Sequence, residues 1–321
     1  MKTLHELWTT FRVAPVVNWT GVNSIIVLSL AIRFNESVDI LSWFIAALVA
    51  WTTQGFPAHI WNDIYNWISG TDKLVDINKT PTGGSHVIQL YYDSDDVFKH
   101  LKNHIPWIVI CLIAVYHFVF VLGWWWYVLL GGISAVAIAV FYSVPPILAD
   151  HRPFIGEWIF AFCGIMISNA FIYYAAAHTW PSAIALLCMI PYVIGNVYML
   201  EMHHVNDIYP DLHADKRKKY TAVSWIYKRT RDPRDICRYF AAIALVAVVA
   251  SLILCKLGIH QAVLFCPLYL YGVFSLTDKY KGVNFEEYPN YLEATVPLEL
   301  KWIKVHTLTG LTFAGLTALP V

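Results

Sequence analysis

Long apolar runs separated by shorter polar stretches dominate this 321-residue chain. A helix needs roughly 20 mainly apolar residues to cross a bilayer, and runs of about that length recur from one end of the chain to the other. They fall at 16–34, 39–57, 105–122, 126–144, 154–177, 182–200, 239–257, 262–277 and 303–320. The pattern predicts an all-α integral membrane protein with about nine transmembrane helices.

Composition supports a bilayer as the solvent of this chain. Apolar residues make up 58% and charged residues 14%, whereas soluble domains have roughly 45–50% and 25%. Residues 1–15 mix Lys2, Glu6 and Arg12 with Leu4 and Trp8, which predicts an interfacial amphipathic helix before the first span. The six cysteines never fall at CxxC spacing, so they indicate neither a disulfide framework nor a zinc site.

Basic residues are distributed unevenly between the two sides that nine spans would define. Of the 22 lysines and arginines, all but Arg33 and Lys256 lie at the N-terminus or in the loops after spans two, four, six and eight. Positive charge favours the cytoplasmic side of a membrane. We therefore expect the N-terminus and these loops to be cytoplasmic and the C-terminus to lie on the opposite side.

One tetrapeptide occurs twice in the chain. Asn62-Asp63-Ile64-Tyr65 recurs as Asn206-Asp207-Ile208-Tyr209, and a histidine stands three residues before each copy, at His59 and His203. Each copy follows an apolar run, spans two and six, so both should lie at the same membrane depth. We expect one domain over 1–321, built as a pseudo-repeat bundle of two halves (roughly 1–150 and 151–321) with acidic motifs at 62–76 and 206–215.

The two motifs carry oxygen ligands of the kind that Mg²⁺ prefers. Mg²⁺ takes one or two carboxylates, keeps waters and accepts phosphate oxygens. On a helix, residues three or four apart share a face, so the oxygens could converge. The polar members are Asn62, Asp63, Asn66, Asp72 and Asp76 in the first motif, and Asn206, Asp207, Asp211 and Asp215 in the second. Two such faces could hold one diphosphate between metal ions, at one surface of the membrane.

These motifs carry a family resemblance. NDIYNWISGTDKLVDINKTPTGGS (62–85) resembles the first aspartate-rich motif of the UbiA superfamily of intramembrane prenyltransferases, and NDIYPDLHADKRKKYT (206–221) resembles its second. Tyr142-Ser143-Val144-Pro145-Pro146 is similar to the family's YSxPP element, and Phe11-Arg12 to its N-terminal basic helix. The resemblance implies nine helices around a cavity open to lipid, with Mg²⁺ and an isoprenoid diphosphate at its cytoplasmic mouth.

The resemblance also implies roles for individual residues. Asp63, Asp207, Asp211 and Tyr142 are the expected catalytic residues. The implied metal ligands are Asp63, Asn66, Asp72, Asp207, Asp211 and Asp215. The implied diphosphate contacts are Asn62, Lys79, Arg152, Asn206, Lys216, Arg217 and Arg12.

The chain departs from the family pattern at several positions. Position 66 is Asn where the first motif has its middle Asp, and position 215 is Asp where the second motif has Gly. Leu148 and Asp150 stand where members commonly have Arg and Lys. An amide coordinates through oxygen without adding charge, so we expect the first metal site to be weaker unless Asp215 compensates.

Glu201 and His204 form a further pair, an ExxH at the end of span six. A di-iron carboxylate site would need a second ExxH and two more glutamates, and the sequence has no second ExxH within a span. An ionisable residue inside a span is a functional candidate. Glu201 is therefore either a proton acceptor from substrate or an interfacial partner of His203 or His204.

The leading hypothesis from the sequence is an Mg²⁺-dependent prenyltransferase that acts on an isoprenoid diphosphate and a lipophilic or aromatic acceptor. The alternative is a UbiA-type terpene cyclase, which uses no acceptor. A repeat-built transporter is disfavoured, because transporters bind near the bilayer midplane. Membrane lipid is an expected partner and nucleic acid is not.

Overall fold

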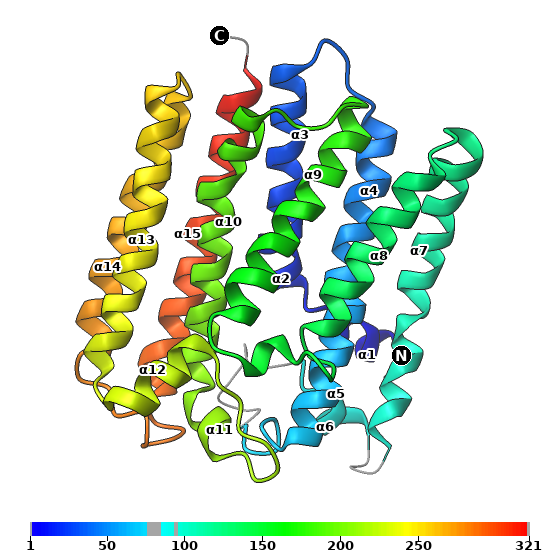
Figure 1. The fold of residues 1–321 in the computed structure, drawn as a ribbon. Helices are drawn as coiled ribbons and strands as arrows, with labels where there is room; N and C mark the ends of the chain where they lie inside the picture. The colour runs from blue at the N-terminus through cyan, green and yellow to red at the C-terminus, as the bar shows by residue number, and fades with distance from the viewer. Residues whose placement is uncertain (1, 76–84, 93–95, 320–321) are drawn as a thin grey trace.

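The computed structural model describes residues 2–75, 85–92 and 96–319, and within these ranges the regular structure is entirely helical (Figure 1). The first half contains α1 (Lys2–Phe11), α2 (Val13–Val16), η1 (Val17–Gly21), α3 (Val22–Phe34), α4 (Ile40–Thr53), η2 (Gln54–Ala58), α5 (His59–Ser69), α6 (Val87–Tyr91), η3 (Val97–His104), α7 (Ile105–Val115), η4 (Tyr116–Val121) and α8 (Trp125–Phe141). The second half contains η5 (Ala149–His151), η6 (Ile155–Phe162), α9 (Cys163–Ala177), α10 (Ala183–Asn206), α11 (Ile208–His213), α12 (Ala222–Thr230), α13 (Pro233–Lys256), η7 (His260–Leu264), α14 (Phe265–Tyr280) and α15 (Leu292–Ala318).

Each predicted span falls mainly on a helix, which confirms the all-α class. Six continuous helical stretches in the described residues are long and apolar enough to cross a membrane: Val13–Phe34, Ile40–Ser69, Val97–Val121, Ile155–Ala177, Ala183–Asn206 and Pro233–Lys256. The count of nine stays a prediction. The helices α8 and α14 have 17 and 16 residues, fewer than the roughly 20 that span a bilayer, and α15 carries four charged residues in its first half.

Large apolar side chains face outward over the long helices. Leu112 on α7 is 63% exposed, Phe120 on η4 75% and Leu245 on α13 64%. So many large, exposed apolar side chains are rare on soluble monomers. In a bilayer these side chains contact lipid instead of water.

The helix α10 runs through the middle of the bundle and packs on α3, α9, α13 and α15. The helices α10 and α15 approach each other closely at this centre because glycines lie at their contacts. A Cβ at Gly310 of α15 would lie 2.2 Å from a ring carbon of Tyr192 on α10, and a Cβ at Gly195 would lie 2.2 Å from His306 Nε2 on α15. The two helices thus interlock, each placing an aromatic ring over a glycine of the other.

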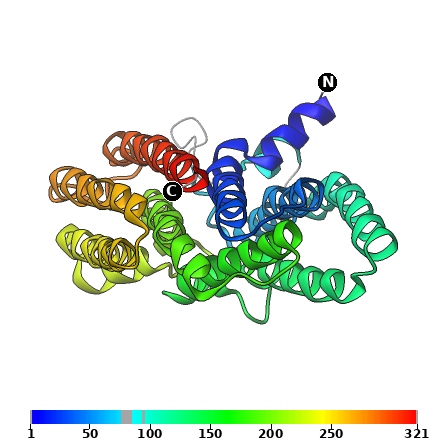
Figure 2. The ribbon, with the colours of Figure 1, turned by 90° about the horizontal axis from the view of Figure 1, so that it is seen from above.

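Both acidic motifs lie at one end of the bundle. The helices α5, α6, α11 and α12 gather there, whereas the C-terminus lies at the opposite end (Figure 1). The predicted N-terminal helix is present as α1 and packs on α5, α6 and η2. Seen along the bundle, α7 and α8 lie at one side and α13 and α14 at the other (Figure 2).

We expect Gly310→Ala to destabilise the protein, because its Cβ would overlap Tyr192. Overpacking a close-packed interior costs about 1–3 kcal/mol of folding free energy. The measurement is the midpoint of thermal unfolding in detergent, which should be lower for Gly310→Ala than for the wild type. Gly315→Ala is the matched control on the same helix, since a Cβ added there would have no neighbouring atom within 4 Å. It should be neutral or stabilising. Equal midpoints for the two variants would contradict the interlocking of α10 and α15.

Candidate active site

A cavity of about 960 Å³ lies within the bundle, lined by residues of α4, α5, α7, α8, α9, α10 and α15. Its walls are mainly apolar and include the aromatic side chains of Phe118, Tyr127 and Phe171. Polar residues gather at the end where the acidic motifs lie. The cavity can therefore hold an apolar molecule with a polar group at that end.

The first motif contributes three side chains to the cavity wall: Asn62, Asn66 and Asp72. The helix α5 ends at Ser69, and Gly70 follows with φ 95°, a left-handed conformation that glycine adopts without a steric penalty. The turn is closed by N–H groups of Gly70 and Asp72 that donate to the Asn66 carbonyl oxygen, at 3.1 and 3.4 Å. This turn brings Asp72 to the same cavity as the helix residues.

The second motif contributes Asp207, which lies between the end of α10 and the start of α11 and also lines the cavity. Asp211, one turn further along, is fully buried and accepts a hydrogen bond from the Thr221 hydroxyl at 3.4 Å. The two motif loops touch directly, because the Lys216 and Arg217 N–H groups donate to the Ser69 carbonyl at 3.3 and 3.1 Å. One cavity mouth thus carries residues of both halves.

Lys219 is the buried cation of this mouth. Its side chain is nearly inaccessible, and Nζ lies 3.4 Å from Asp150 Oδ2 and 3.4 Å from Asn66 Oδ1. Asp150 Oδ2 also accepts from Asn62 Nδ2 at 3.2 Å and from the Ser143 hydroxyl at 3.3 Å. Lys219 therefore links the first motif to the segment that follows Tyr142.

Lys219 and Asp150 were not among the site residues predicted from sequence. Lys219 is the last of four consecutive basic residues, and their pattern does not distinguish the one that turns inward. The distinction comes from the backbone: the Lys219 N–H donates to the Asp211 carbonyl at 3.0 Å, and Thr221 then caps the first turn of α12. The neighbouring Lys218 side chain is exposed.

The charges at the mouth perturb one another. Burial, together with the neighbouring carboxylates Asp63 and Asp207, raises the pKa of Asp72 well above its usual value. Burial likewise raises the pKa of Asp211. Burial alone would lower the pKa of Lys219, but the carboxylates around it, Asp150 first, outweigh burial and raise its pKa. The mouth has more carboxylates than one ammonium can neutralise, which favours a bound cation.

Asp63 is held by protein donors instead of facing the cavity. Its carboxylate accepts from the Ser85 N–H at 3.2 Å and from the Ser85 hydroxyl, and His100 Nε2 lies 3.2 Å from Oδ2. Asp63 and His100 are both buried. This network joins α5, η3 and the segment that leads into α6, so Asp63 positions the first motif.

The remaining predicted residues are placed differently from one another. Arg12 and Tyr142 line the cavity. Asn206 is buried and donates to Glu299 Oε2 at 2.5 Å. The side chains of Arg152, Asp215, Lys216 and Arg217 are exposed and do not line the cavity. Lys79 and Asp76 lie outside the described residues.

Comparison with known proteins identifies the fold. No protein-family model and no curated protein matches the chain. A solved structure of a UbiA homologue from Archaeoglobus fulgidus bound to GPP and Mg²⁺ is 13% identical, with a TM-score of 0.56 over 92% of this chain and 99% of that one. The same homologue bound to DMAPP and Mg²⁺ is 12% identical, with a TM-score of 0.56 over 92% and 98%. The chain therefore has the UbiA fold and is an integral membrane protein, with six helical stretches among the described residues that are long and apolar enough to cross a membrane.

We expect Lys219→Met to destabilise the protein by about 3–5 kcal/mol, because removing one partner of a buried ion pair leaves the other charge unpaired. The measurement is the thermal unfolding midpoint in detergent. Lys218→Met, next to it but exposed, is the matched control and should be neutral. Adding Asp150→Asn to Lys219→Met should recover part of the loss, since the unpaired carboxylate is then gone. A Lys219→Met protein as stable as the control would contradict this account.

Proposed function

We propose that this chain is a UbiA-type, Mg²⁺-dependent intramembrane prenyltransferase, which ionises an allylic isoprenoid diphosphate and transfers the prenyl group to a lipophilic or aromatic acceptor. The observation that carries the proposal is the cavity of about 960 Å³ with apolar walls and a polar mouth formed by Asn66, Asp72, Asp207 and Lys219. An isoprenoid diphosphate has the same division into an apolar chain and a charged head.

The fold and the motifs support this proposal independently. The fold is shared with a homologue whose structures hold GPP or DMAPP together with Mg²⁺. The two acidic motifs, recognised from sequence alone, lie at the polar mouth of one cavity. We assign the chain to the UbiA superfamily on these two grounds, with 1–321 as one domain of two half-repeats.

The residues at the mouth fit Mg²⁺. Within the part of the chain that the structure describes, Asp207 Oδ1 and Asp211 Oδ1 are buried and have no hydrogen-bond partner. Mg²⁺ binds through one or two carboxylates and leaves its other positions to water and phosphate. The residues that would hold the ion are Asp207, Asp211, Asp72 and Asn66. Asp63 would join them if its carboxylate released the hydrogen bond from Ser85 or His100 and bound the ion instead.

Bound Mg²⁺ would neutralise the charge that develops on the diphosphate as it leaves. Lys219 is placed to add a positive charge at the polar mouth of the cavity. It lies beside the segment after Tyr142, where this chain lacks the basic residues that the family carries. Asn62 holds Asp150, which in turn orients Lys219. Arg12 and Tyr142, which line the cavity, are the further diphosphate contacts in this proposal.

The proposed reaction breaks the bond between C1 of the isoprenoid and the diphosphate oxygen, and the electron pair leaves with the diphosphate. The acceptor then attacks C1 and loses a proton. The apolar walls exclude water from the allylic cation, and the faces of Phe118, Tyr127 and Phe171 can stabilise its charge. We place the mouth on the cytoplasmic side, as the basic residues predict, with lipid access for the hydrophobic reactants.

The same cavity is compatible with a terpene cyclase. Aromatic walls around an apolar chain favour intramolecular attack by a double bond of the isoprenoid as well as attack by an acceptor. The ionisation step and its residues would be the same, so only the product distinguishes the two functions.

We expect Asp207→Ala to reduce diphosphate release from an isoprenoid diphosphate by at least about 100-fold, the scale seen when a group that stabilises transition-state charge is removed. Release is measured with purified protein, Mg²⁺ and a lipophilic or aromatic acceptor, and EDTA should abolish it in the wild type. The control is Asp278→Ala. Asp278 is an exposed aspartate on α14, and it pairs with Lys281 just after the end of that helix. Full turnover of Asp207→Ala, or turnover in EDTA, would overturn the proposal.

Incubation of the purified protein with C10 to C20 diphosphates and no acceptor should yield no organic product if the chain is a transferase. Product should form once a lipophilic or aromatic acceptor is added, as detected by mass spectrometry. Cyclic hydrocarbons or alcohols formed without an acceptor would instead establish the cyclase function.

A further inference from the structure

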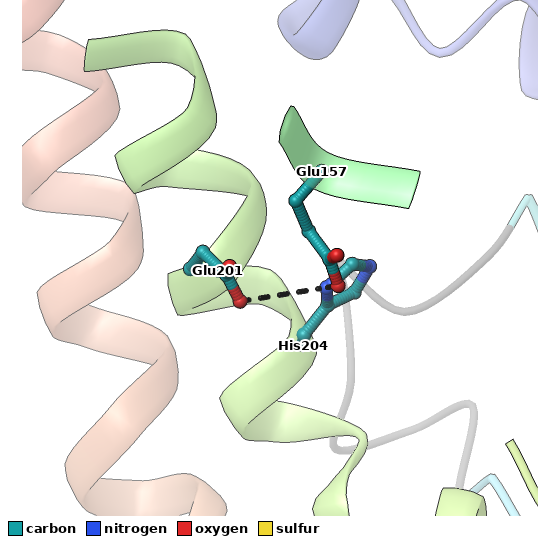
Figure 3. A group of neighbouring side chains, drawn as sticks. All are labelled: Glu157, Glu201 and His204. Carbon is teal, nitrogen blue, oxygen red and sulfur yellow. Dashed lines mark ion pairs between the residues drawn. The ribbon is translucent and has the colours of Figure 1, made fainter. Parts of the chain in front are cut away.

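Three ionisable side chains converge inside the bundle, beside the second motif. Glu157 comes from η6, and Glu201 and His204 come from the last turns of α10 (Figure 3). Glu157 and Glu201 are fully buried and His204 is 3% exposed. Among the residues that the structure describes, they form the one group of this kind whose metal-ligating atoms all lie within 4.8 Å of one another.

Each carboxylate has one oxygen that accepts a hydrogen bond from the protein and one oxygen that accepts none. Glu157 Oε1 accepts from the Ala222 N–H at 3.0 Å, and Glu201 Oε1 accepts from the Tyr239 hydroxyl. The Trp158 indole N–H donates to that hydroxyl at 2.9 Å. In the described structure, Glu157 Oε2, Glu201 Oε2 and His204 Nδ1 have no hydrogen-bond partner and are inaccessible to solvent. Outer-shell hydrogen bonds that orient ligating side chains are a usual feature of metal sites.

The spacing of the three side chains suits a metal ion. His204 Nδ1 lies 3.4 Å from Glu157 Oε1 and 3.9 Å from Glu201 Oε2. Ligands about 2.0–2.1 Å from a tetrahedral ion lie about 3.4 Å apart. The first distance matches this value and the second is longer, so a small adjustment of the Glu201 side chain would bring both carboxylates and the imidazole to one ion.

Charge balance is compatible with a bound cation. The His204 imidazole lies within ion-pairing distance of both glutamates, and when protonated it balances one of the two carboxylates. Lys219 adds no direct partner, because its contact is Asp150, in the diphosphate mouth. Metal ligands bind in their deprotonated form, so a divalent ion that displaces the imidazole proton would balance both carboxylates and leave the imidazole neutral.

We propose that Glu157, Glu201 and His204 bind a divalent transition-metal ion, with Zn²⁺ as the best match. Two carboxylate oxygens and an imidazole nitrogen form a mixed ligand set that Zn²⁺ accepts, whereas Mg²⁺ prefers oxygen alone. The ion would tie η6 to α10 one turn before Asp207. His204 lines the same cavity, but none of the three residues is assigned to Mg²⁺ or diphosphate, so the metal site can be tested independently of the proposed reaction.

The test is a Zn²⁺ titration of the purified full-length protein after chelation and removal of the chelator, without Mg²⁺ and without any diphosphate. Isothermal calorimetry or equilibrium dialysis with elemental analysis measures the binding. We expect about one Zn²⁺ per chain in the wild type. Glu157→Gln and Glu201→Gln each replace a metal ligand. Loss of an outer-shell partner alone can weaken metal binding by roughly 100-fold, so each of these variants should weaken Zn²⁺ binding by at least that factor.

Glu299→Gln is the matched control. Glu299 is also a buried glutamate beside a histidine, with Oε1 3.4 Å from His203 Nδ1, but it lies outside the group. It should keep wild-type Zn²⁺ affinity. Tyr239→Phe, which removes only the hydroxyl on Glu201, should fold normally and weaken binding about 10- to 100-fold.

Cobalt provides a second readout that does not depend on activity. Co²⁺ in place of Zn²⁺ should give visible absorption bands with the wild type that are lost in Glu201→Gln and retained in Glu299→Gln. No Zn²⁺ uptake by the wild type would overturn the proposal. Equal losses of Zn²⁺ affinity in Glu157→Gln and Glu299→Gln would also overturn it. So would Zn²⁺ binding that is abolished by Asp211→Asn but is unchanged in Glu157→Gln.

Discussion

Lys219 places a buried positive charge where carboxylates from both halves of the chain meet. Its ammonium contacts Asp150 and Asn66, and its backbone N–H holds Asp211. Without that charge the Asp150 carboxylate would be buried without its ion-pair partner, and an unpaired charge is costly away from water. Lys219 thus takes part in the contact between the two motifs, in the return of the chain into α12 and in the electrostatics of the mouth.

The polar mouth and the apolar cavity form one functional unit. The acidic motifs can bind cations and a diphosphate because they are concentrated at one end, and the rest of the cavity has walls that favour a hydrocarbon chain. A reactive allylic cation would survive only where water is excluded. The separation of charge from apolar surface therefore serves both the membrane fold and the proposed chemistry.

The helix α10 connects the two polar sites. It carries Glu201 and His204 in its last turns and ends at the second motif, while its middle interlocks with α15 through Gly195 and Gly310. A helix clamped in this way presents its terminal side chains in fixed positions. That rigidity is what the proposed metal group and the diphosphate mouth both require.

The sequence by itself determined the helical class, the approximate positions of the spans and the repeated acidic motifs. These are local properties, because a run of apolar residues or a tetrapeptide keeps its meaning wherever the chain goes. Asn62, Asn66, Asp72 and Asp207 line the cavity as members of those motifs. The amphipathic N-terminal helix was predicted on the same local grounds.

Only the tertiary structure decided which charged residues turn inward and which pairs meet. It selected Lys219 over Lys216 and Arg217, paired it with Asp150, and engaged Asp63 with Ser85 and His100. It also brought Glu157 to Glu201 and His204, which sequence spacing could not reveal. The physical reason is that burial and charge pairing depend on distances between residues far apart in the chain, and those distances are set by the packing of the whole bundle.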